Sequence, residues 1–286
     1  MICLLGLGEV GQVFAQDLRH PLTAWDLKFA DPASVPSRAL TRFGLTPPAD
    51  AHKAVAAVDV IICAVTAAQD EEAARSVAGG FKPGAFFVDV NSASPGQKRR
   101  AAAVIEAAGG RYVEAVIMSP IASKRLASPM LLGGPRAAAF LPVARKLGFS
   151  GARVYAEELG LASATKLCRS VMIKGIEALV TESMLAARHY GVEDAVLASL
   201  SDFFPGQDWP VLADYLIRRG LEHGTRRAEE LREAAATVRE ADVPPVMSEA
   251  IAGRQDLSAA LKAALTQPDL PTMLDAMRAQ GDTKTC

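Results

Sequence analysis

The stretch GLGEVGQVFAQDL, residues 6–18, places glycines at Gly6, Gly8 and Gly11 between a short apolar run and an amphipathic segment. Ile2–Leu5 has the composition of a strand, and Val10–Arg19 has the periodicity of a helix. In such a turn the first glycine permits a sharp bend, the second lets a ligand approach the backbone, and the third lets the helix lie close to the strand. The helix N-terminus offers N–H groups to an anion. The stretch is therefore predicted to cradle a phosphate.

An acidic residue at the end of the next strand extends this prediction to a dinucleotide. Asp26 closes the run LTAWD, twenty positions beyond Gly6. A carboxylate there accepts hydrogen bonds from a ribose 2′-hydroxyl and repels a 2′-phosphate, which favours NAD over NADP. Lys28 can instead pair with a 2′-phosphate, which leaves NADP open. We expect the cofactor to contact the three glycines and Asp26, together with Leu7, Glu9, Val10, Val65 and Thr66.

The first half of the chain alternates short apolar runs with helical patterns. The expected strands are Ile2–Leu5, Leu22–Trp25, Val58–Val65, Ala85–Val90, Tyr112–Met118, Met130–Leu132 and Ala152–Tyr155. The expected helices between them include Val10–Arg19, Gln69–Ala78, Gly96–Ala108 and Arg136–Leu147. This alternation predicts a parallel, doubly wound α/β sheet of the Rossmann type. Its apolar strands are expected to be covered by helices on both faces.

The second half has no expected strand. Leu159–His189 is predicted to form one helix of about 45 Å at 1.5 Å per residue. Turn signals follow at Gly191, at residues 203–210, at Gly220 and at Pro244–Pro245, and Arg226–Glu240 is the clearest of the amphipathic helices between them. We therefore expect a Rossmann domain over residues 1–157 and an all-helical substrate and dimerisation domain over residues 158–286.

Composition narrows the classes of partner. The chain has 286 residues, of which 50% are hydrophobic, and 31 Lys and Arg against 32 Asp and Glu leave a net charge of −1. This balance argues against nucleic acid and anionic membranes as partners. The four cysteines (Cys3, Cys63, Cys168 and Cys286) and the four histidines have no ligand spacing, so no metal is expected. Without a signal peptide or a spanning segment, the protein is expected to be soluble and cytoplasmic.

Charged residues in the first half are expected at helix surfaces. Asp70, Glu71 and Glu72 resemble the first turn of a helix, where acidic groups suit the helix dipole. The run Lys98–Arg100 is interpreted as a solvated helix face.

A polar stripe runs along the predicted long helix. Ser163, Lys166, Ser170, Lys174 and Glu177 fall three or four residues apart, and apolar residues occupy the other side. A solvated stripe on an ordinary amphipathic helix is the simplest interpretation. This helix, however, leaves the expected cofactor domain and has apolar flanks, so its first turns should border the cleft between domains. A lysine that loses hydration there can act as a general base.

At this point the sequence resembles the β-hydroxyacid dehydrogenases, which include 3-hydroxyisobutyrate, tartronate semialdehyde and 6-phosphogluconate dehydrogenases. GLGEVG is similar to the family's opening GLGxMG, and DVNSASP (residues 89–95) is similar to its substrate motif D-x-S-T-x-x-P. Gly160, Lys166 and Ser170 match its catalytic signature, with Ser170 in place of Asn. The C-terminal part is similar to an uncharacterised helical domain that accompanies some cofactor domains of the 6-phosphogluconate dehydrogenase type.

The resemblance implies a reaction and a set of roles. It implies hydride transfer between nicotinamide and a hydroxyacid-like alcohol, with Lys166 as general acid and base and Ser170 beside it. It also implies a homodimer and a small-molecule substrate bound by Asn91, Ser92 and Ser119. Lys174 is the next cation along the polar stripe, and it either pairs with an anionic group of the substrate or points to solvent. The family's carboxylate cradle D-A-P-V-S-G-G is replaced by residues 114–120, where Met118 has no side-chain donor and Pro120 has no N–H. A larger or less acidic substrate is therefore expected.

Two alternatives remain open at this stage. Imine reductases share this architecture, but they usually carry a residue other than lysine at the catalytic position. A non-catalytic NAD-binding or sensing protein would keep the same first twenty-six residues, so only the chemistry beside the cofactor separates it from an enzyme.

Overall fold

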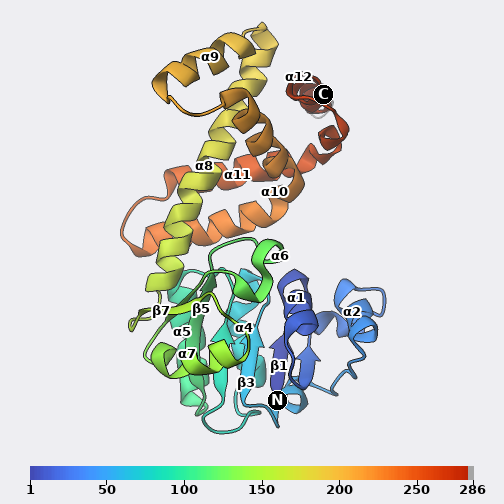
Figure 1. Cartoon of the computed structure of the whole chain (residues 1–286), viewed down its shortest axis with the longest axis vertical. Helices are drawn as coiled ribbons and strands as arrows, with labels where there is room; N and C mark the ends of the chain where they lie inside the picture. The colour runs from blue at the N-terminus through green and yellow to red at the C-terminus, as the bar shows by residue number, and fades with distance from the viewer. Residues whose placement is uncertain (283–286) are drawn as a thin grey trace. The chain divides into compact units, whose positions relative to one another are not determined.

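The computed structural model describes residues 1–282, which divide into two compact units with the boundary between Lys166 and Leu167 (Figure 1). The first unit holds a seven-stranded sheet, and the described residues of the second form helices without a strand. The long helix α8 (Leu161–Tyr190) begins in the first unit and continues in the second. The expected Rossmann-type sheet with a helical C-terminal region is confirmed.

The order of the strands in the sheet determines where a ligand can bind. Its strands are β1 (Ile2–Leu5), β2 (Leu22–Trp25), β3 (Val60–Cys63), β4 (Phe86–Asp89), β5 (Arg111–Ile117), β6 (Met130–Gly133) and β7 (Ala152–Ala156), in the order β2-β1-β3-β4-β5-β6-β7. β1 lies between β2 and β3, so the winding direction of the sheet reverses there. Open α/β sheets bind ligands at such a point, outside the carboxyl ends of the strands.

The expectation of a wholly parallel sheet is wrong at one edge. β1 to β5 are parallel, but β6 pairs with β5 in the antiparallel direction, and β7 runs parallel to β6. The connection from β5 to β6 contains only the short helix α6 (Ile121–Lys124) and one 3₁₀ turn (Arg125–Ala127). A parallel crossover needs a longer helix that packs back across the sheet, whereas this short connection returns the chain beside β5.

Helices cover both faces of the sheet in the first unit. They are α1 (Glu9–Asp17), α2 (Val35–Phe43), α3 (Ala51–Val55), α4 (Asp70–Val77), α5 (Pro95–Ala107) and α7 (Ala137–Lys146). Successive strand residues enter different cores: Leu4 packs in the cluster of Phe14, and Leu5 packs in the cluster of Val77. Burial on both faces explains why the strands are continuously apolar.

The helical unit is built on α10 and α11, which pack closely along their lengths. It contains α9 (Glu193–Phe203), α10 (Trp209–Glu240), α11 (Val246–Ala260) and α12 (Leu270–Asp282). The turn expected at Gly220 is wrong, because Gly220 and Gly224 both lie inside α10. A Cβ on Gly224 would lie 2.5 Å from the carbonyl oxygen of Gln255 in α11, so glycine serves here for close helix packing. In the described part of the chain, no helix is both long and apolar enough to cross a membrane.

Candidate functional site

The glycine turn has the geometry that its sequence predicts. Gly6 follows β1 with φ +89°, and a Cβ there would lie 2.3 Å from the carbonyl oxygen of Ala64. A Cβ on Gly11 would lie 2.1 Å from the carbonyl oxygen of Gly6, so both positions require glycine. Gly8 has open space where a Cβ would be, and it starts α1 without a side-chain cap. The first N–H groups of α1, at Glu9 and Val10, are thus left without a capping side chain. This turn fits a phosphate.

Asp26 and the residues after β3 border the same turn. Asp26 Oδ2 accepts the N–H of Leu7 at 2.9 Å, and Oδ1 accepts the N–H of Lys28 at 2.9 Å. Each carboxylate oxygen has a second lone pair, so the group keeps acceptors for ribose hydroxyls. Val65 lies 3.1 Å from the position of a Cβ on Gly6, and Thr66 follows it at the start of a 3₁₀ turn. The turn, Asp26 and Val65 are therefore neighbours at the switch point of the sheet.

The loop after β4 carries the closest contact among the candidate catalytic and substrate residues. Lys166 Nζ donates a hydrogen bond of 2.6 Å to Ser92 Oγ, and both residues belong to the first unit. Asn91, in contrast, is buried with its side chain directed into the unit: Nδ2 donates to Asp70 Oδ1 at 2.6 Å and to Cys63 Sγ at 3.3 Å. The structure thus joins Ser92 with Lys166 and directs Asn91 elsewhere.

A buried carboxylate fixes the start of the helix that carries Lys166. Glu114 in β5 is fully buried, and its two oxygens accept the N–H groups of Gly160 at 2.8 Å and Ser163 at 2.7 Å. These donors lie at the N-terminal end of α8, where N–H groups have no partner within the helix. A Cβ on Gly133 would lie 2.5 Å from Glu114 Oε2, so a glycine in β6 makes room for this carboxylate. Lys166 follows Ser163 within one turn.

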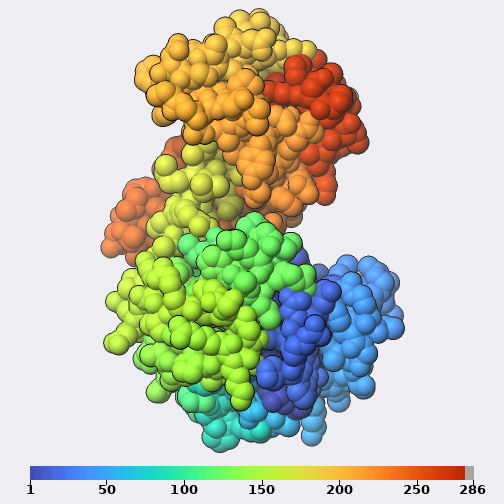
Figure 2. Space-filling view, viewed as in Figure 1, coloured from blue at the N-terminus to red at the C-terminus, as the bar shows by residue number. Residues whose placement is uncertain are grey.

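The residues in place of the family's carboxylate cradle begin within β5 and continue past its end. Ser119 has a buried hydroxyl with no hydrogen-bond partner in the described structure, which leaves it available to a ligand. The next segment, through α6 and Arg125, lies beside α1 on the surface of the first unit (green beside blue in Figure 2). Arg125 holds it there through two hydrogen bonds of 2.7 Å to Asp17. The segment after Ser119 is thus tied to the helix that follows the glycine turn.

The loop that carries Ser92 contacts a buried polar cluster, which includes Asp70, Asp89, Lys98 and Tyr112. Lys98 Nζ pairs with Asp89 Oδ1 at 2.6 Å, and neither side chain has access to solvent. Tyr112 donates to Asp89 Oδ2 at 2.5 Å, and the N–H of Asn91 donates to Oδ1 at 2.9 Å. The run Lys98–Arg100 is therefore only partly the solvated face that its sequence suggests, because Lys98 points inward.

Burial and a neighbouring charge perturb the carboxyl group of Asp70 in this cluster. Burial, followed by the nearby charge of Asp89, raises the pKa of Asp70 to about 8, although Lys98 acts in the opposite direction. Burial alone would lower the pKa of Lys98, but the carboxyl groups of Asp89 and Asp70 more than offset it and raise that pKa. At neutral pH Asp70 is therefore held as the neutral carboxylic acid.

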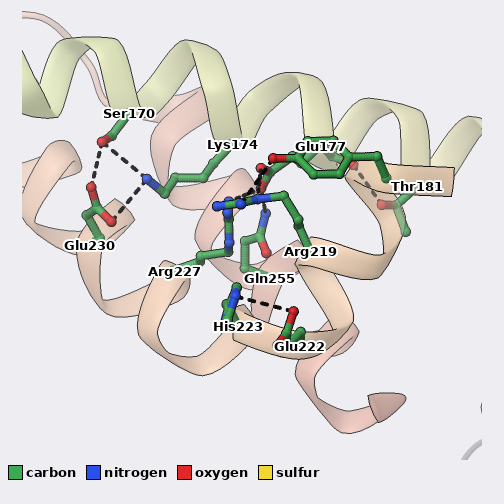
Figure 3. Close-up of polar contacts among 11 residues, drawn as sticks. Ser170, Lys174, Glu177, Thr181, Arg219, Glu222, His223, Arg227, Glu230 and Gln255 are labelled. Atoms are coloured by element: carbon green, nitrogen blue, oxygen red, sulfur yellow. Dashed lines mark hydrogen bonds and ion pairs between the residues drawn. The ribbon is translucent and has the colours of Figure 1, made fainter. Parts of the chain in front are cut away.

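The polar stripe of α8 continues into a second network within the helical unit (Figure 3). Ser170 donates to Glu230 Oε1 at 2.6 Å, and Lys174 pairs with Glu230 Oε2 at 3.0 Å and donates to Ser170 at 3.2 Å. Burial lowers the pKa of Lys174, against the opposing effect of Glu230. Ser170 and Lys174 are thus joined through a residue of α10.

Glu177, one turn further along α8, makes the second half of this network. It is buried and pairs with Arg227 of α10, and Gln255 of α11 donates to it at 3.4 Å (Figure 3). His223 lies at the edge of the cluster, 3.4 Å from Glu222. These pairs hold α8 against α10 and α11.

Several of these groups could not be found from sequence motifs. Glu230 and Arg227 lie in an ordinary amphipathic pattern, and Asp70 looks like a helix-dipole residue. Glu114 did leave a signal, because it is a charge within the apolar run YVEAVI. Cys3 and Cys63 are buried, Cys168 is exposed, and Cys286 lies outside the described residues. Over residues 1–282, no group of three or more His, Cys, Asp or Glu side chains is placed to hold a metal.

Two glycine substitutions should separate folding from cofactor binding. We expect Gly11→Ala to lower the free energy of unfolding by about 1–3 kcal/mol, because the new methyl group overlaps backbone. Gly8→Ala should leave stability unchanged and weaken dinucleotide binding at least tenfold, since its Cβ meets only the space above the turn. Urea unfolding and titration with NADH measure the two effects. Equal NADH affinity in wild type and Gly8→Ala would contradict the assigned role of the turn.

The raised pKa of Asp70 predicts a pH-dependent gain in stability on neutralising it. Because the folded pKa of about 8 exceeds the unfolded value of 3.8, the stability contributed by this group is lost as pH rises between them. Asp70→Asn removes this loss, so its advantage over wild type should be absent near pH 4 and grow up to about pH 8. The slope is at most about 1.4 kcal/mol per pH unit. Thermal unfolding at pH 4, 6 and 8 tests this; parallel curves for the two proteins would show that Asp70 ionises normally.

Solved structures share this fold along nearly the whole chain. A conserved hypothetical protein from Sinorhizobium meliloti 1021 is 33% identical, with a TM-score of 0.76 over 98% of this chain and 96% of its own. A 3-hydroxyisobutyrate dehydrogenase from Mycobacterium tuberculosis is 20% identical, with a TM-score of 0.71 over 97% and 98%. An imine reductase from Streptomyces aurantiacus is 19% identical, with a TM-score of 0.55 over 97% and 99%. The last two likenesses show the fold alone.

Family models match both parts of the chain. Residues 187–258 match a domain of unknown function, DUF1932. Residues 1–155, more than half of the chain, match the NAD binding domain of 6-phosphogluconate dehydrogenase, in agreement with the glycine turn, Asp26 and the switch point of the sheet. The chain therefore belongs to the family of this NAD-binding domain.

Proposed function

We propose that this protein is an NAD(P)-dependent oxidoreductase that transfers a hydride between nicotinamide and a hydroxyacid-like alcohol, with Lys166 as general acid and base. The observation that carries the proposal is the 2.6 Å hydrogen bond from Lys166 Nζ to Ser92 Oγ. Ser92 follows β4, so it lies at the same edge of the parallel sheet as the glycine turn after β1 and Thr66 after β3. An amine is thereby held at the edge where this family binds its dinucleotide.

The proposed chemistry needs little from the protein beyond binding and proton transfer. When bound, nicotinamide supplies the hydride acceptor or donor. In alcohol oxidation, neutral Lys166 takes the hydroxyl proton as the C–H bond gives up its hydride and a carbonyl forms; in reduction, protonated Lys166 returns that proton. Ser92 orients the lysine, and the anchoring of α8 by Glu114 sets its position.

The cofactor and substrate are proposed from the groups that stay available. Asp26 keeps acceptors for a ribose 2′-hydroxyl, which supports NAD over NADP. The unpartnered hydroxyl of Ser119 supports a contact with substrate. Met118 has no side-chain donor and Pro120 has no N–H, which supports a substrate less acidic than those of the β-hydroxyacid dehydrogenases. Ser170 and Lys174 both contact Glu230, so their proposed roles beside the substrate involve that carboxylate.

We also propose that the protein is a homodimer that associates through α8. The middle of α8, within the helical unit, exposes the large apolar side chains of Met172, Ile173, Ile176 and Leu179. Their spacing places them along one face, opposite the buried stripe of Ser170, Lys174 and Glu177. This apolar stretch lies between exposed Arg169 and Glu182, and an apolar patch with charges at its two ends suits contact with a copy of itself across a two-fold axis.

Loss of the lysine tests the reaction. We expect wild type to reduce NAD with a hydroxyacid or a sugar acid, and to prefer NAD to NADP. Lys166→Met should lower kcat by at least about 100-fold with NADH affinity unchanged, as for a lost general base. Lys146→Met, an exposed lysine of α7, is the matched control and should keep full activity. If wild type binds NADH but turns over none of the hydroxyacids and sugar acids tested, the result would favour an imine or bulkier carbonyl substrate. If wild type binds NADH but also fails to reduce imines and bulkier carbonyl compounds, the result would favour a sensor.

A charge placed on the exposed face of α8 tests the dimer. We expect wild type to elute as a dimer in size-exclusion chromatography with light scattering, and Leu179→Glu to elute as a monomer, because burying the carboxylate is costly. Phe203→Glu on α9 is the control, since Phe203 is even more exposed but lies outside this face. A monomeric wild type, or the same shift in both variants, would contradict this interface.

A further inference from the structure

Asp70 is connected to the proposed catalytic lysine through a short chain of contacts. It is the first residue of α4 and is fully buried, and its Oδ1 accepts the hydrogen bond from Asn91 Nδ2 at 2.6 Å. Asn91 is the neighbour of Ser92 along the chain, and Ser92 accepts the hydrogen bond from Lys166. All four residues belong to the first unit. Asn91 is thus the residue that links Asp70 to the hydrogen bond between Lys166 and Ser92.

The contacts of Asn91 leave little freedom to the loop. Its main-chain N–H donates to Asp89 Oδ1 at 2.9 Å, and its side-chain amide donates to Asp70 and to Cys63. A side chain held at both of its amide hydrogens and at its own N–H fixes the backbone that leads into Ser92. Asn91 therefore acts through the position of its neighbour, and Asp70 supplies the acceptor that anchors it.

We propose that Asp70 is a positioning residue: through Asn91 it fixes the loop that presents Ser92 to Lys166. The inference rests on the proposed function, because it assigns Asp70 to the contact on which that function depends. Asp70 itself touches neither substrate nor cofactor in this role. It is distinct from the residues that the catalytic signature and the substrate motif point to.

The charges around Asp70 explain which form of it does this. The groups that face it are Asp89 of β4, Lys98 of α5, Cys63 of β3 and Tyr112 of β5. Lys98 is the cation among them, and it already pairs with Asp89 at 2.6 Å. A second buried carboxylate would repel Asp89, so Asp70 is held as the neutral acid, which still accepts from Asn91 through its carbonyl oxygen. Ionisation of Asp70 at alkaline pH should loosen the loop.

Three variants test the role in turnover. Asp70→Leu removes the acceptor at similar size, Asp70→Asn keeps it without the acid, and Glu72→Leu changes an exposed acid in the same first turn of α4. We expect Asp70→Leu to lower kcat at least tenfold, with KM and NADH affinity changed less than threefold. Asp70→Asn and Glu72→Leu should stay within about twofold of wild type at pH 7. Equal kcat for Asp70→Leu and Glu72→Leu would overturn the proposal.

The pH profile keeps the proposal testable should Asp70→Leu fail to fold. Above pH 8 wild type should lose kcat relative to Asp70→Asn by at least threefold, because only wild type can ionise at this position. Dividing one profile by the other isolates the effect of residue 70, because the two proteins differ at no other position. A constant ratio from pH 6 to pH 9.5 would overturn the proposal.

A measurement independent of turnover separates this inference from the proposed function. Acetic anhydride labels neutral amines, and peptide mass spectrometry reads the labelling of Lys166 at each pH. We expect the pH at which half of Lys166 is labelled to differ by at least 0.5 between wild type and Asp70→Asn, because only wild type ionises at residue 70 above pH 8. This pH should be the same for wild type and Glu72→Leu. An unchanged curve overturns the positioning role. The labelling curves of wild type and Asp70→Asn can also differ while wild type oxidises no substrate. That result supports the positioning role and overturns the proposed dehydrogenase function.

Discussion

The ion pair between Lys98 and Asp89 is wholly removed from solvent, and the loop that carries Ser92 is built on it. Two charges are expensive to bury, and removing one partner of such a pair typically costs about 3–5 kcal/mol. The cost is offset here by further donors to the carboxylate, from the hydroxyl of Tyr112 and the N–H of Asn91. Since β4 ends at Asp89, this pair sets the direction in which the chain leaves the sheet.

A buried carboxylate also fixes the position of Lys166. Glu114 lies in the interior of β5 and accepts two N–H groups from the start of α8, so α8 leaves the sheet in a set direction. The lysine and its hydroxyl partner are therefore each attached to a buried carboxylate of a neighbouring strand, β5 and β4. Rigid support of this kind is what a short hydrogen bond between two flexible side chains requires.

The sequence predicts the parts of this arrangement that depend on local rules. The seven strands follow from apolar runs, and the long helix follows from its periodicity. The glycine turn follows from the spacing of its glycines, the first of which, Gly6, has a positive φ. The antiparallel β6 does not, since strand direction depends on how a connection packs. Nor does the inward turn of Asn91 or Lys98, because each depends on partners at a distance, Asp70 and Asp89. Motif spacing therefore locates Lys166 and Ser92 but not the groups that hold them.

The burial pattern of α8 follows from the same long-range partners. A periodicity argument buries the apolar face of a helix and exposes the polar one. In the helical unit α8 departs from this pattern: Glu177 and Ser170 are buried beside apolar residues such as Met184, while Met172 and Leu179 are exposed. The polar face is tolerated inside because α10 supplies matching charges, so that Lys174 pairs with Glu230 and Glu177 pairs with Arg227. The exposed apolar face of α8 has no packing partner within the described part of its own unit, and this is the observation on which the proposed dimer rests.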